Sequence, residues 1–335
     1  MAWDGFLEPS SIEAVAAAVS AVPPAQWCQA FFLFAAAAVL AVAAAPREAR
    51  TLLVDYGARK ADDSPPHPGQ KQQATAPRCQ AQNRGWTLSL ITAVTSWGQV
   101  PHSWFGAFYV VSLGCTVFWL VQYLTGGTLM HLIASRQSTA PGLSPTLGQV
   151  AVTGAMMLLQ VARRIFEHAT IVKPSMSTMW VVHWVLGMGF YLFISVSVWV
   201  EGSRAILERS VTPSRTFDIS SLLKLSVAIP AFLFAWVNQY RCHAHLAGLK
   251  KYSVPEEGLF RRLICPHYTC ECLLYFSLAL AAAPPGQSCN KTLLCALAFV
   301  LVNLGVTAAG TRKWYARKFG SAAVAEKWNM IPFLF

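Results

Sequence analysis

Charged side chains are scarce in this sequence of 335 residues: Asp, Glu, Lys and Arg make up 12% of it, against about 25% in soluble domains. Hydrophobic residues make up 55%. Such a composition excludes an ordinary soluble globular protein and favours an integral membrane protein.

Paired-cysteine motifs and nucleotide-binding motifs are also missing. None of the nine cysteines forms a C-x-x-C pair, so we expect free thiols rather than a disulfide framework. Cys242, His243 and His245 have a spacing that one helix cannot turn into tetrahedral coordination, and we expect no metal. No G-x-G-x-x-G after a strand and no P-loop is present, so any nucleotide must bind between helix ends.

Seven apolar stretches approach the roughly 20 residues that a helix needs to cross the hydrocarbon core. They are 27–45, 103–124, 146–161, 178–200, 222–240, 268–283 and 293–310. The sequence therefore predicts an all-α integral membrane protein, a bundle of seven transmembrane helices. The first stretch begins too late for a signal peptide and follows acidic residues, although Ala43–Ala45 resembles a cleavage site.

The distribution of positive charge predicts the orientation. With the N-terminus on the luminal side, the cytosolic segments hold 20 of the 26 Lys and Arg residues and the opposite side holds five. This asymmetry places the C-terminus in the cytosol. The formal net charge of +11 then belongs to membrane topology, and we expect no nucleic-acid partner.

We expect one domain across residues 1–335, because no internal repeat and no second composition class is present. Residues 61–84, rich in Pro, Gln and Ala, are predicted to form a flexible cytosolic loop. The sequon at Asn290 falls on the luminal side but close to two spans, which leaves glycosylation open.

Polar residues gather at the cytosolic ends of spans three, five, six and seven, where burying them without partners is costly. The first group follows span three and lies largely on one helical face: Gln160, Arg163, Arg164, Glu167 and His168. Two readings stay open here. The helix either ends in an interfacial Arg–Glu pair or directs a guanidinium at a phosphate or carboxylate.

The other three groups fit a polar groove for a dinucleotide. Gln239, His243 and Lys250 lie on a predicted helix that continues span five into the cytosol. His267 and Glu271 are one turn apart at the start of span six, where the carboxylate needs a partner. The fourth group, in the tail, contains Arg312, Lys313, Tyr315, Arg317 and Lys318.

These stretches, in this order, resemble the steroid 5α-reductase family, and most of all its polyprenol (polyprenal) reductase branch. The resemblance covers most of the chain from Val100 onward, residues 100–335. It rests on VPHSWF at 100–105, RRIFE at 163–167, NQYRCHAHLAGLKK at 238–251, PHYTCECLLY at 266–275 and the ending WYARKF…IPFLF.

The resemblance implies a seven-helix enzyme of the endoplasmic reticulum membrane that holds NADPH at the cytosolic side. Carried over by motif, the cofactor-binding residues are Arg164, Gln239, His243, Lys250, His267, Glu271, Arg312 and Tyr315. The steroid branch has a Gln-Glu pair and a Tyr where this sequence has Gly98, Gln99 and Val161. This departure argues against a steroid substrate and leaves the proton donor open among Gln160, His102, Gln99 and Tyr268.

The resemblance also implies the activity: NADPH-dependent reduction of the α-isoprene double bond of a long-chain polyprenol or polyprenal. The product, dolichol or dolichal, would serve dolichol-phosphate synthesis and protein N-glycosylation. Other readings are a sterol or steroid double-bond reductase, an isoprenylcysteine methyltransferase, and a non-enzymatic lipid-binding membrane protein.

The last five residues, Ile331–Phe335, are apolar although chain ends are usually polar and frayed. We expect 313–319 to continue span seven, the chain to turn back, and Ile331–Phe335 to dock on the bundle near the cofactor site.

Overall fold

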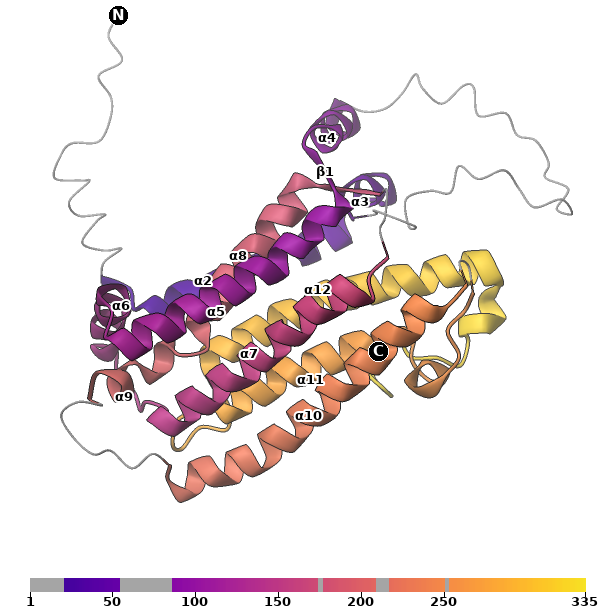
Figure 1. The fold of residues 1–335 in the computed structure, drawn as a ribbon. Coiled ribbons are helices and arrows are strands. Elements are labelled where there is room, and N and C mark those ends of the chain that lie inside the picture. Colours follow the sequence, from indigo (N-terminus) through magenta and orange to yellow (C-terminus); the bar gives the residue numbers. More distant parts are fainter. Residues whose placement is uncertain (1–20, 55–85, 174–176, 209–216, 251–252) are drawn as a thin grey trace, which may run out of the picture.

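A computed structural model describes residues 21–54, 86–173, 177–208, 217–250 and 253–335 of the chain. The predicted loop at 61–84 lies outside the described residues. The described chain is mostly helical, and long helices run side by side (Figure 1).

Seven helices coincide with the seven apolar stretches. They are α2 (Pro24–Ala44), α5 (Phe105–Thr125), α7 (Leu147–Thr170), α8 (Val181–Ser197), α10 (Ile219–Gly248), α11 (Pro266–Ala281) and α12 (Lys291–Phe319). Shorter helices connect or flank them: α3 (Arg47–Val54), α4 (Trp86–Ser96), α6 (Thr128–Ser138) and α9 (Ser203–Glu208). Single turns of 3₁₀-helix are η2 (His102–Trp104), η3 (Val200–Gly202), η4 (Gly258–Arg261) and η5 (Ser321–Val324).

Within the described residues, five helical segments are long and apolar enough to cross a membrane: Pro24–Ala44, His102–Thr125, Val181–Glu208, Ile219–Gly248 and Lys291–Phe319. The remaining two helices fall short for different reasons. Helix α11 has only 16 residues, and the last turns of α7 carry Arg163, Arg164 and Glu167. The prediction of an all-α membrane protein is confirmed, with five spans by this criterion.

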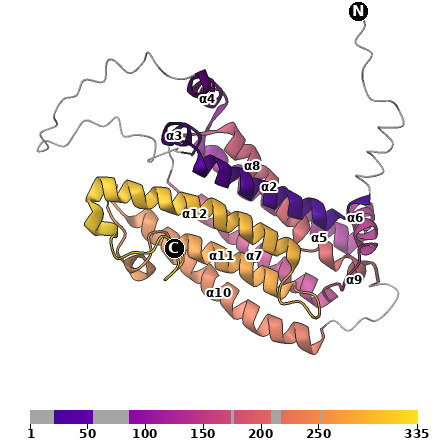
Figure 2. The same ribbon diagram turned by 180° about the vertical axis from the view of Figure 1, so that it is seen from behind.

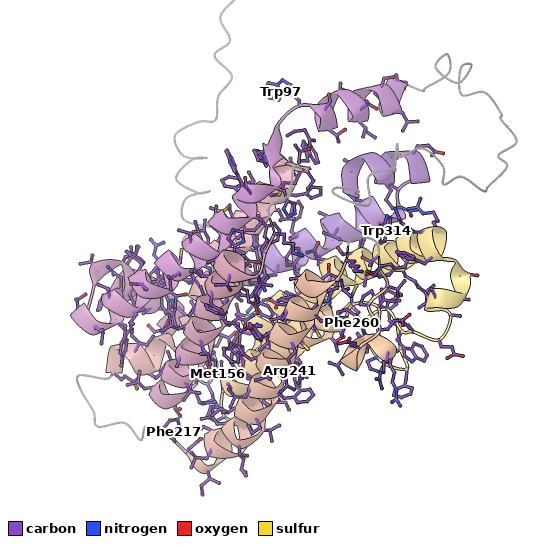
Figure 3. All side chains as sticks on the ribbon, turned by 45° about the vertical axis from the view of Figure 1, so that its right-hand side comes forward. Trp97, Met156, Phe217, Arg241, Phe260 and Trp314 are labelled. Atoms are coloured by element: carbon purple, nitrogen blue, oxygen red, sulfur yellow. The ribbon has the colours of Figure 1, made fainter. Side chains whose placement is uncertain are left out.

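The long helices close a ring through their contacts. Helix α10 packs on α11, α11 on α12, α12 on α2, α2 on α8, α8 on α5, and α5 on α7, which returns to α10 and α11 (Figures 1 and 2). Alanines such as Ala228, Ala279 and Ala296 are fully buried between helices, where small side chains let backbones approach closely. Met156 lies among the packed side chains, whereas Trp97 projects away from the bundle (Figure 3).

Side-chain caps fix where three of the long helices begin. Thr146 and Gln149 form a capping box at the start of α7, and Asp218 and Ser221 form one at the start of α10. The backbone N–H of Ser221, 2.6 Å from the Asp218 carboxylate, lowers the pKa of that carboxyl. Asn290 caps α12 by accepting from Leu293 N at 3.0 Å and is 2% exposed, so the folded chain gives this sequon no accessible amide for a glycan.

A two-stranded antiparallel ribbon departs from the all-α expectation. Strand β1 (Gln99–Pro101) pairs with β2 (Thr178–Trp180), with Val100 opposite Met179. The ribbon ties the segments that lead into α5 and α8 together, because each strand directly precedes one of these helices or its first turn.

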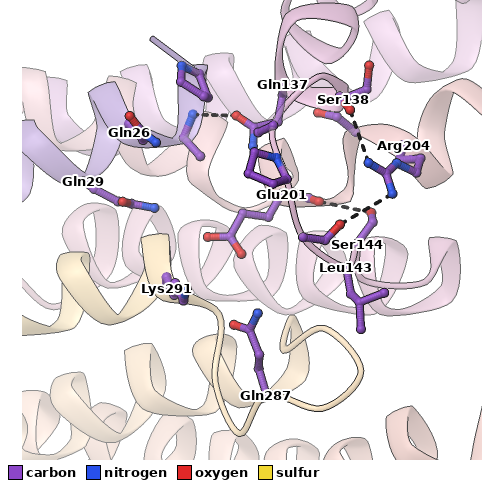
Figure 4. Close-up of a pocket in the computed structure, with 16 residues that line it drawn as sticks. Gln26, Gln29, Gln137, Ser138, Leu143, Ser144, Glu201, Arg204, Gln287 and Lys291 are labelled. Atoms are coloured by element: carbon purple, nitrogen blue, oxygen red, sulfur yellow. Dashed lines mark hydrogen bonds between the residues drawn. The ribbon is translucent and has the colours of Figure 1, made fainter.

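A polar pocket of about 330 Å³ lies at the end of the bundle where α12 begins (Figure 4). Glu201 on its wall anchors the first turn of α12: its Oε1 accepts from Thr292 N at 2.8 Å and from Thr292 Oγ1 at 2.6 Å. A carboxylate at a helix N-terminus satisfies free N–H groups and complements the helix dipole. Thr292 is fully buried, so both donors depend on protein partners.

Replacing Glu201 by alanine is expected to lower the free energy of unfolding by about 2 kcal/mol, because buried donors of Thr292 lose their acceptor. Glu201→Gln keeps one oxygen in place, so a loss of about 1 kcal/mol or less is expected. Thermal unfolding in detergent micelles checks both values. Equal stability of the alanine variant and the parent would contradict the anchoring role.

The C-terminal segment turns back onto the bundle, as predicted, but different side chains dock. Residues 328–329 pair with 262–265, with Ile264 N donating to Trp328 O at 2.8 Å. Met330 is 1% exposed, and Ile331 packs on the core, whereas Phe333 and Leu334 are 85% and 78% exposed. The expectation that all of Ile331–Phe335 docks is therefore wrong for Phe333 and Leu334. Met330 and Ile331 hold the segment, and the Phe335 ring lies near Gly305 of α12.

Met330→Ala is expected to lower the free energy of unfolding by about 2 kcal/mol. The buried side chain is lost, and the surrounding structure can fill the space only in part. Leu334→Ala is the matched control, and its effect should stay within about 0.5 kcal/mol because that side chain is exposed. Denaturation followed by tryptophan fluorescence compares the two. Similar losses in both variants would disprove the distinction between Met330 and the residues after it.

Candidate active site

Polar side chains from α5, α7, α10 and α11 meet at one end of the bundle, in the last two turns of α7. Glu167 is 1% exposed, Gln239 3%, Arg163 5% and Gln160 6%. Inside a membrane protein, such a concentration of buried polar groups is costly unless each finds a partner.

Glu167 is the centre of this cluster. Arg163 Nη1 donates to its Oε1 at 2.6 Å, and Arg164 Nη1 donates to its Oε2. His243 Nδ1 lies 2.8 Å from the same Oε2. One carboxylate therefore holds two guanidinium groups of α7 and one imidazole of α10. The Arg–Glu pairs that the spacing predicted are present, and they lie in the protein interior rather than at an exposed helix end.

Arg164 connects this centre to α5. Its Nη2 donates to the Tyr109 hydroxyl at 2.5 Å, and its guanidinium carbon lies 4.9 Å from the centroid of the Tyr109 ring. Its Nη1 also lies 2.8 Å from His243 Nδ1. A neutral Nδ1 accepts from Arg164, whereas a protonated Nδ1 donates to Glu167. The imidazole of His243 can therefore be neutral or protonated and keep a hydrogen bond at Nδ1 in the same position.

Two amides extend the cluster to α11. Gln239 Nε2 donates to Glu271 Oε2 and to the His267 carbonyl oxygen at 3.2 Å, while its Oε1 accepts from Arg163 Nη2. Gln160 Oε1 accepts from Arg163 Nη2 at 2.7 Å. The amides of Gln160 and Gln239 thus link the arginines of α7 to the carboxylate of α11. The cluster therefore contains two guanidinium groups and two carboxylates, whose formal charges balance.

Buried nitrogens without a hydrogen-bond partner within the described residues include Arg163 Nε and His267 Nδ1 at this end. Buried polar atoms are usually satisfied, and the exceptions often mark a place for a ligand or water. His267 also packs beside His243, with ring centroids 5.6 Å apart, and beside Tyr268, at 4.3 Å.

Six of the twelve residues singled out from the sequence are brought together in this cluster: Gln160, Arg164, Gln239, His243, His267 and Glu271. Tyr268 is next to it through the His267 ring. The remaining five lie elsewhere.

Gln99 and His102 lie near the ribbon. Gln99 is exposed on β1 and its Nε2 donates to Thr95 O at 2.6 Å. His102 stacks on Phe105, one turn before Tyr109, with ring centroids 5.4 Å apart. The hydrogen bonds described above for Glu167 and Glu271 come from α7 and α10, and the His102 ring is separated from Tyr109 by the ring of Phe105.

Lys250, Arg312 and Tyr315 also lie outside it. Lys250 is exposed after the end of α10. Arg312 donates to the carbonyl oxygens of Val324 and Lys327, so it holds the returning C-terminal segment. Burial lowers the pKa of Lys327, whose ammonium donates to Pro255 O at 3.0 Å. Tyr315 packs against the hydrophobic core.

Tyr109 was missed at the sequence level, and so was Tyr191 beside it, with ring centroids 6.3 Å apart. Both lie in apolar runs without a charged neighbour, where a tyrosine looks like core. A signal was available: Tyr109 falls near the start of a span, level with the polar end of α7. Arg163 and Glu167 were noticed in the motif but not placed among the binding residues, although they form its buried centre.

The chemistry of this end fits a phosphorylated dinucleotide. Arginine and histidine side chains suit phosphate oxygens, and amide and imidazole groups suit a carboxamide or ribose hydroxyl. The unpartnered His267 Nδ1 gives one such position. No group of three His, Cys, Asp or Glu residues in the described ranges lies close enough to hold a metal ion.

Comparison with known proteins gives a consistent result. Residues 214–335 match the family model of 3-oxo-5-alpha-steroid 4-dehydrogenase. Polyprenal reductase of Xenopus tropicalis is 26% identical over 265 residues, which cover 71% of this chain and 81% of that protein. Polyprenal reductase 1 of Oryza sativa subsp. indica is 28% identical over 287 residues, with coverage of 70% and 79%.

The yeast Saccharomyces cerevisiae polyprenal reductase is 29% identical over 177 residues, covering 51% of this chain and 60% of that protein. The family match includes α10, α11 and α12, and therefore Gln239, His243 and Glu271 of the cluster. The resemblance read from the motifs is confirmed: residues 214–335 match the steroid dehydrogenase family model, and the similar proteins include polyprenal reductases of animals, plants and yeast.

Proposed function

We propose that this chain is an NADPH-dependent polyprenal reductase, which reduces the α-isoprene double bond of polyprenal to give dolichal. Dolichal would then feed dolichol-phosphate synthesis and protein N-glycosylation. The observation that carries the proposal is the buried cluster around Glu167, which joins four helices at one end of a membrane bundle. The curated relatives supply the substrate class.

The proposed topology is supported by the distribution of charges and by the ring of helices. We place the chain in the endoplasmic reticulum membrane with seven spans acting as one domain, the N-terminus in the lumen and the C-terminus in the cytosol. Helix α7 can cross despite its arginines because their partners lie on α10 and α5, inside the ring. Helix α11 is short. The carbonyl oxygens of its last residue, Ala281, and of Ala283 just after it accept from Gln149 of α7.

The aldehyde is the better substrate than the alcohol for a chemical reason. Hydride adds to a carbon–carbon double bond when a conjugated carbonyl can take up the charge, and an allylic alcohol has no such group. NADPH, when bound, supplies the hydride that forms the new C–H bond at the β-carbon. The protein must then stabilise negative charge on the aldehyde oxygen and provide a proton to the α-carbon.

The cofactor residues are assigned to the cytosolic end of the cluster. Arg164, His243 and His267 offer cationic or N–H groups, and Gln239 and Glu271 offer acceptors for an amide or ribose hydroxyl. Lys250, Arg312 and Tyr315 belong to this set only by motif, and the contacts of Arg312 give it a structural part instead.

The geometry favours Tyr109 as the residue whose hydroxyl group donates to the aldehyde oxygen. Its oxygen accepts from Arg164 Nη2, so the hydroxyl proton points to a different acceptor, and an aldehyde oxygen would be one. The adjacent guanidinium stabilises negative charge on the phenolic oxygen. Among the four donors considered from the sequence, Gln160 is engaged with Arg163, and Gln99 and His102 lie outside the cluster.

The test is a side-by-side assay of purified protein with NADPH and three substrates: polyprenal, polyprenol and a 3-oxo-Δ4 steroid. Oxidation of NADPH with polyprenal, and dolichal identified by mass spectrometry, is the expected result. Reduction of polyprenol with polyprenal untouched would overturn the aldehyde mechanism. Thermal stabilisation by S-adenosylmethionine and not by NADPH would favour a methyltransferase, and stabilisation by neither would favour a lipid-binding protein.

A further inference from the structure

A second cavity, of about 260 Å³, lies between α5, α7, α8 and α9 at the end of the bundle opposite to the Glu167 cluster. Its walls are mostly apolar and include two tryptophans. Among the lining residues are Trp119, Met130, Gly154, Leu158, Trp199 and Ile206.

The polar groups on these walls are few. Trp199 Nε1 is buried without a hydrogen-bond partner within the described residues, whereas Ser195 and Thr116 are occupied. Ser195 Oγ donates to Leu192 O at 2.7 Å and accepts from Trp119 Nε1 at 3.1 Å. Thr116 Oγ1 donates to Ser112 O at 2.8 Å. A water molecule needs two to four polar partners, so this space is not suited to water. Apolar cavities of about 150 Å³ stay dry and bind benzene, and by that scale this cavity would hold about ten carbon atoms.

The cavity lies on the same helices that carry the proposed reacting end. On α5, Thr116 and Tyr123 continue the helical face of Tyr109 at steps of seven residues. On α8, Ser195 follows Tyr191 by one turn. Ten residues of α7 separate Gly154 from Arg164, a distance of about 15 Å along the helix. A chain whose head lies at Tyr109 and Arg164 would therefore reach the cavity several carbon–carbon bonds behind its head.

The rim of the cavity suggests how a longer chain would leave. Leu120 and Ala151 line it and are exposed on the outer surface of α5 and α7. In a membrane this surface faces lipid tails, so a chain that fills the cavity can continue into the bilayer. A subsite of this kind would hold a fixed part of the chain and leave its total length free.

We propose that this cavity is the subsite for the isoprenoid tail. It would hold about two isoprene units of the chain, in the part that follows the aldehyde end. The proposal rests on the proposed function and adds to it a discrimination by chain length: long-chain aldehydes gain binding energy here, and aldehydes too short to reach it do not. The apolar lining, the volume and the shared helices are its support. A saturated acyl chain of a membrane lipid is the competing occupant.

Gly154→Leu tests the proposal. A Cβ at Gly154 meets no atom within 4 Å, so the new side chain enters open space in the cavity and not a packed wall. Leucine is also a better helix former than glycine, so the unfolding temperature should be kept or raised. The matched control is Gly114→Leu, a glycine of α5 with equally open surroundings that lies on the exposed side of the helix and does not line the cavity.

The assay compares kcat/KM for a long-chain polyprenal and for geranial, an aldehyde of two isoprene units. For Gly154→Leu, we expect the ratio of long to short to fall at least tenfold, with geranial reduced at the parent rate; Gly114→Leu should keep the ratio. Ala155→Phe fills the same cavity from the next position and should give the same result.

An unchanged ratio in both cavity variants would overturn the subsite and assign the cavity to a membrane lipid. Loss of activity toward both aldehydes in the variants would also contradict it, because blocking a tail site must spare geranial. If the parent protein reduces neither aldehyde with NADPH, the proposed function itself fails. The unchanged-ratio outcome leaves that function intact, so the two failures are distinguishable.

Discussion

Replacing Glu167 by alanine is expected to lower the free energy of unfolding by about 3–5 kcal/mol, the range for removing one partner of a buried ion pair. Glu167 is 1% exposed and is the shared partner of Arg163, Arg164 and His243. Without it, two guanidinium groups remain inside the bundle with only Glu271 to balance them. Thermal and chemical unfolding in detergent micelles measures the loss.

The control is Glu257→Ala, which removes the other carboxylate that pairs with a histidine of α10. Glu257 is 83% exposed and lies 3.4 Å from His245. Exposed pairs contribute about 0–1 kcal/mol, so little change is expected. Glu167→Gln separates charge from volume, since it keeps the size of the side chain. If Glu167→Ala were as stable as the control, the cluster would have to be hydrated. The claim that the buried contacts of Glu167 stabilise the fold would then be wrong.

The sequence was sufficient to predict the helices and insufficient to decide which of them cross the membrane by hydropathy alone. Long apolar runs specify helix position because every backbone group in lipid must be bonded within the helix. The runs at 146–161 and 268–283 became α7 and α11. Helix α11 is shorter than the five candidate spans, and α7 is long enough but carries charged residues in its last turns. Their polar residues are tolerated because partners from other helices surround them, and such partners are a property of tertiary structure.

The site was predictable to the extent that spacing along one helix determines it. Gln160, Arg164 and Glu167 share a face of α7, so their proximity follows from helix geometry. The contacts that join α7 to Gln239 and Glu271 were anticipated only through motif resemblance. His102 was considered as a donor because it lies in the VPHSWF motif, and Gln99 because it directly precedes that motif, where the steroid branch has a Gln-Glu pair. The ribbon holds this segment at the edge of α5 and α8.

Arg312 illustrates the opposite limit. A basic residue close to the predicted cofactor end suits phosphate binding. The apolar ending predicted that the chain turns back, but the sequence did not indicate that the returning segment passes Arg312. The carbonyl oxygens of Val324 and Lys327 come within reach of its guanidinium only because residues 328–330 dock on 262–269. Which residues the returning segment contacts depends on its path in three dimensions, and the pattern that predicted the turn does not specify that path.

Tyr109 was the largest omission, and it carries the second large effect. Tyr109→Phe is expected to lower kcat for polyprenal by about 10²–10⁴-fold, the usual contribution of a positioned acid or oxyanion donor. The ring is kept, so packing against Phe105, Tyr191 and His168 is preserved. Only the hydroxyl that accepts from Arg164 is removed. Steady-state kinetics with saturating NADPH measures kcat, and titration of NADPH measures cofactor affinity.

The kinetic pattern distinguishes a donor from a support for Arg164. A donor acts on the aldehyde, so kcat falls and the Kd of NADPH stays within about threefold of the parent value, whereas a support would weaken cofactor binding through Arg164. Tyr268→Phe is the matched control: that tyrosine packs on His267 next to the cluster, and kcat should change by less than about tenfold. A full-rate Tyr109→Phe enzyme together with an inactive Tyr268→Phe enzyme would reverse the assignment. Proton donation would then move from α5 to α11, because Tyr109 contacts Arg164 whereas Tyr268 packs on His267 of α11.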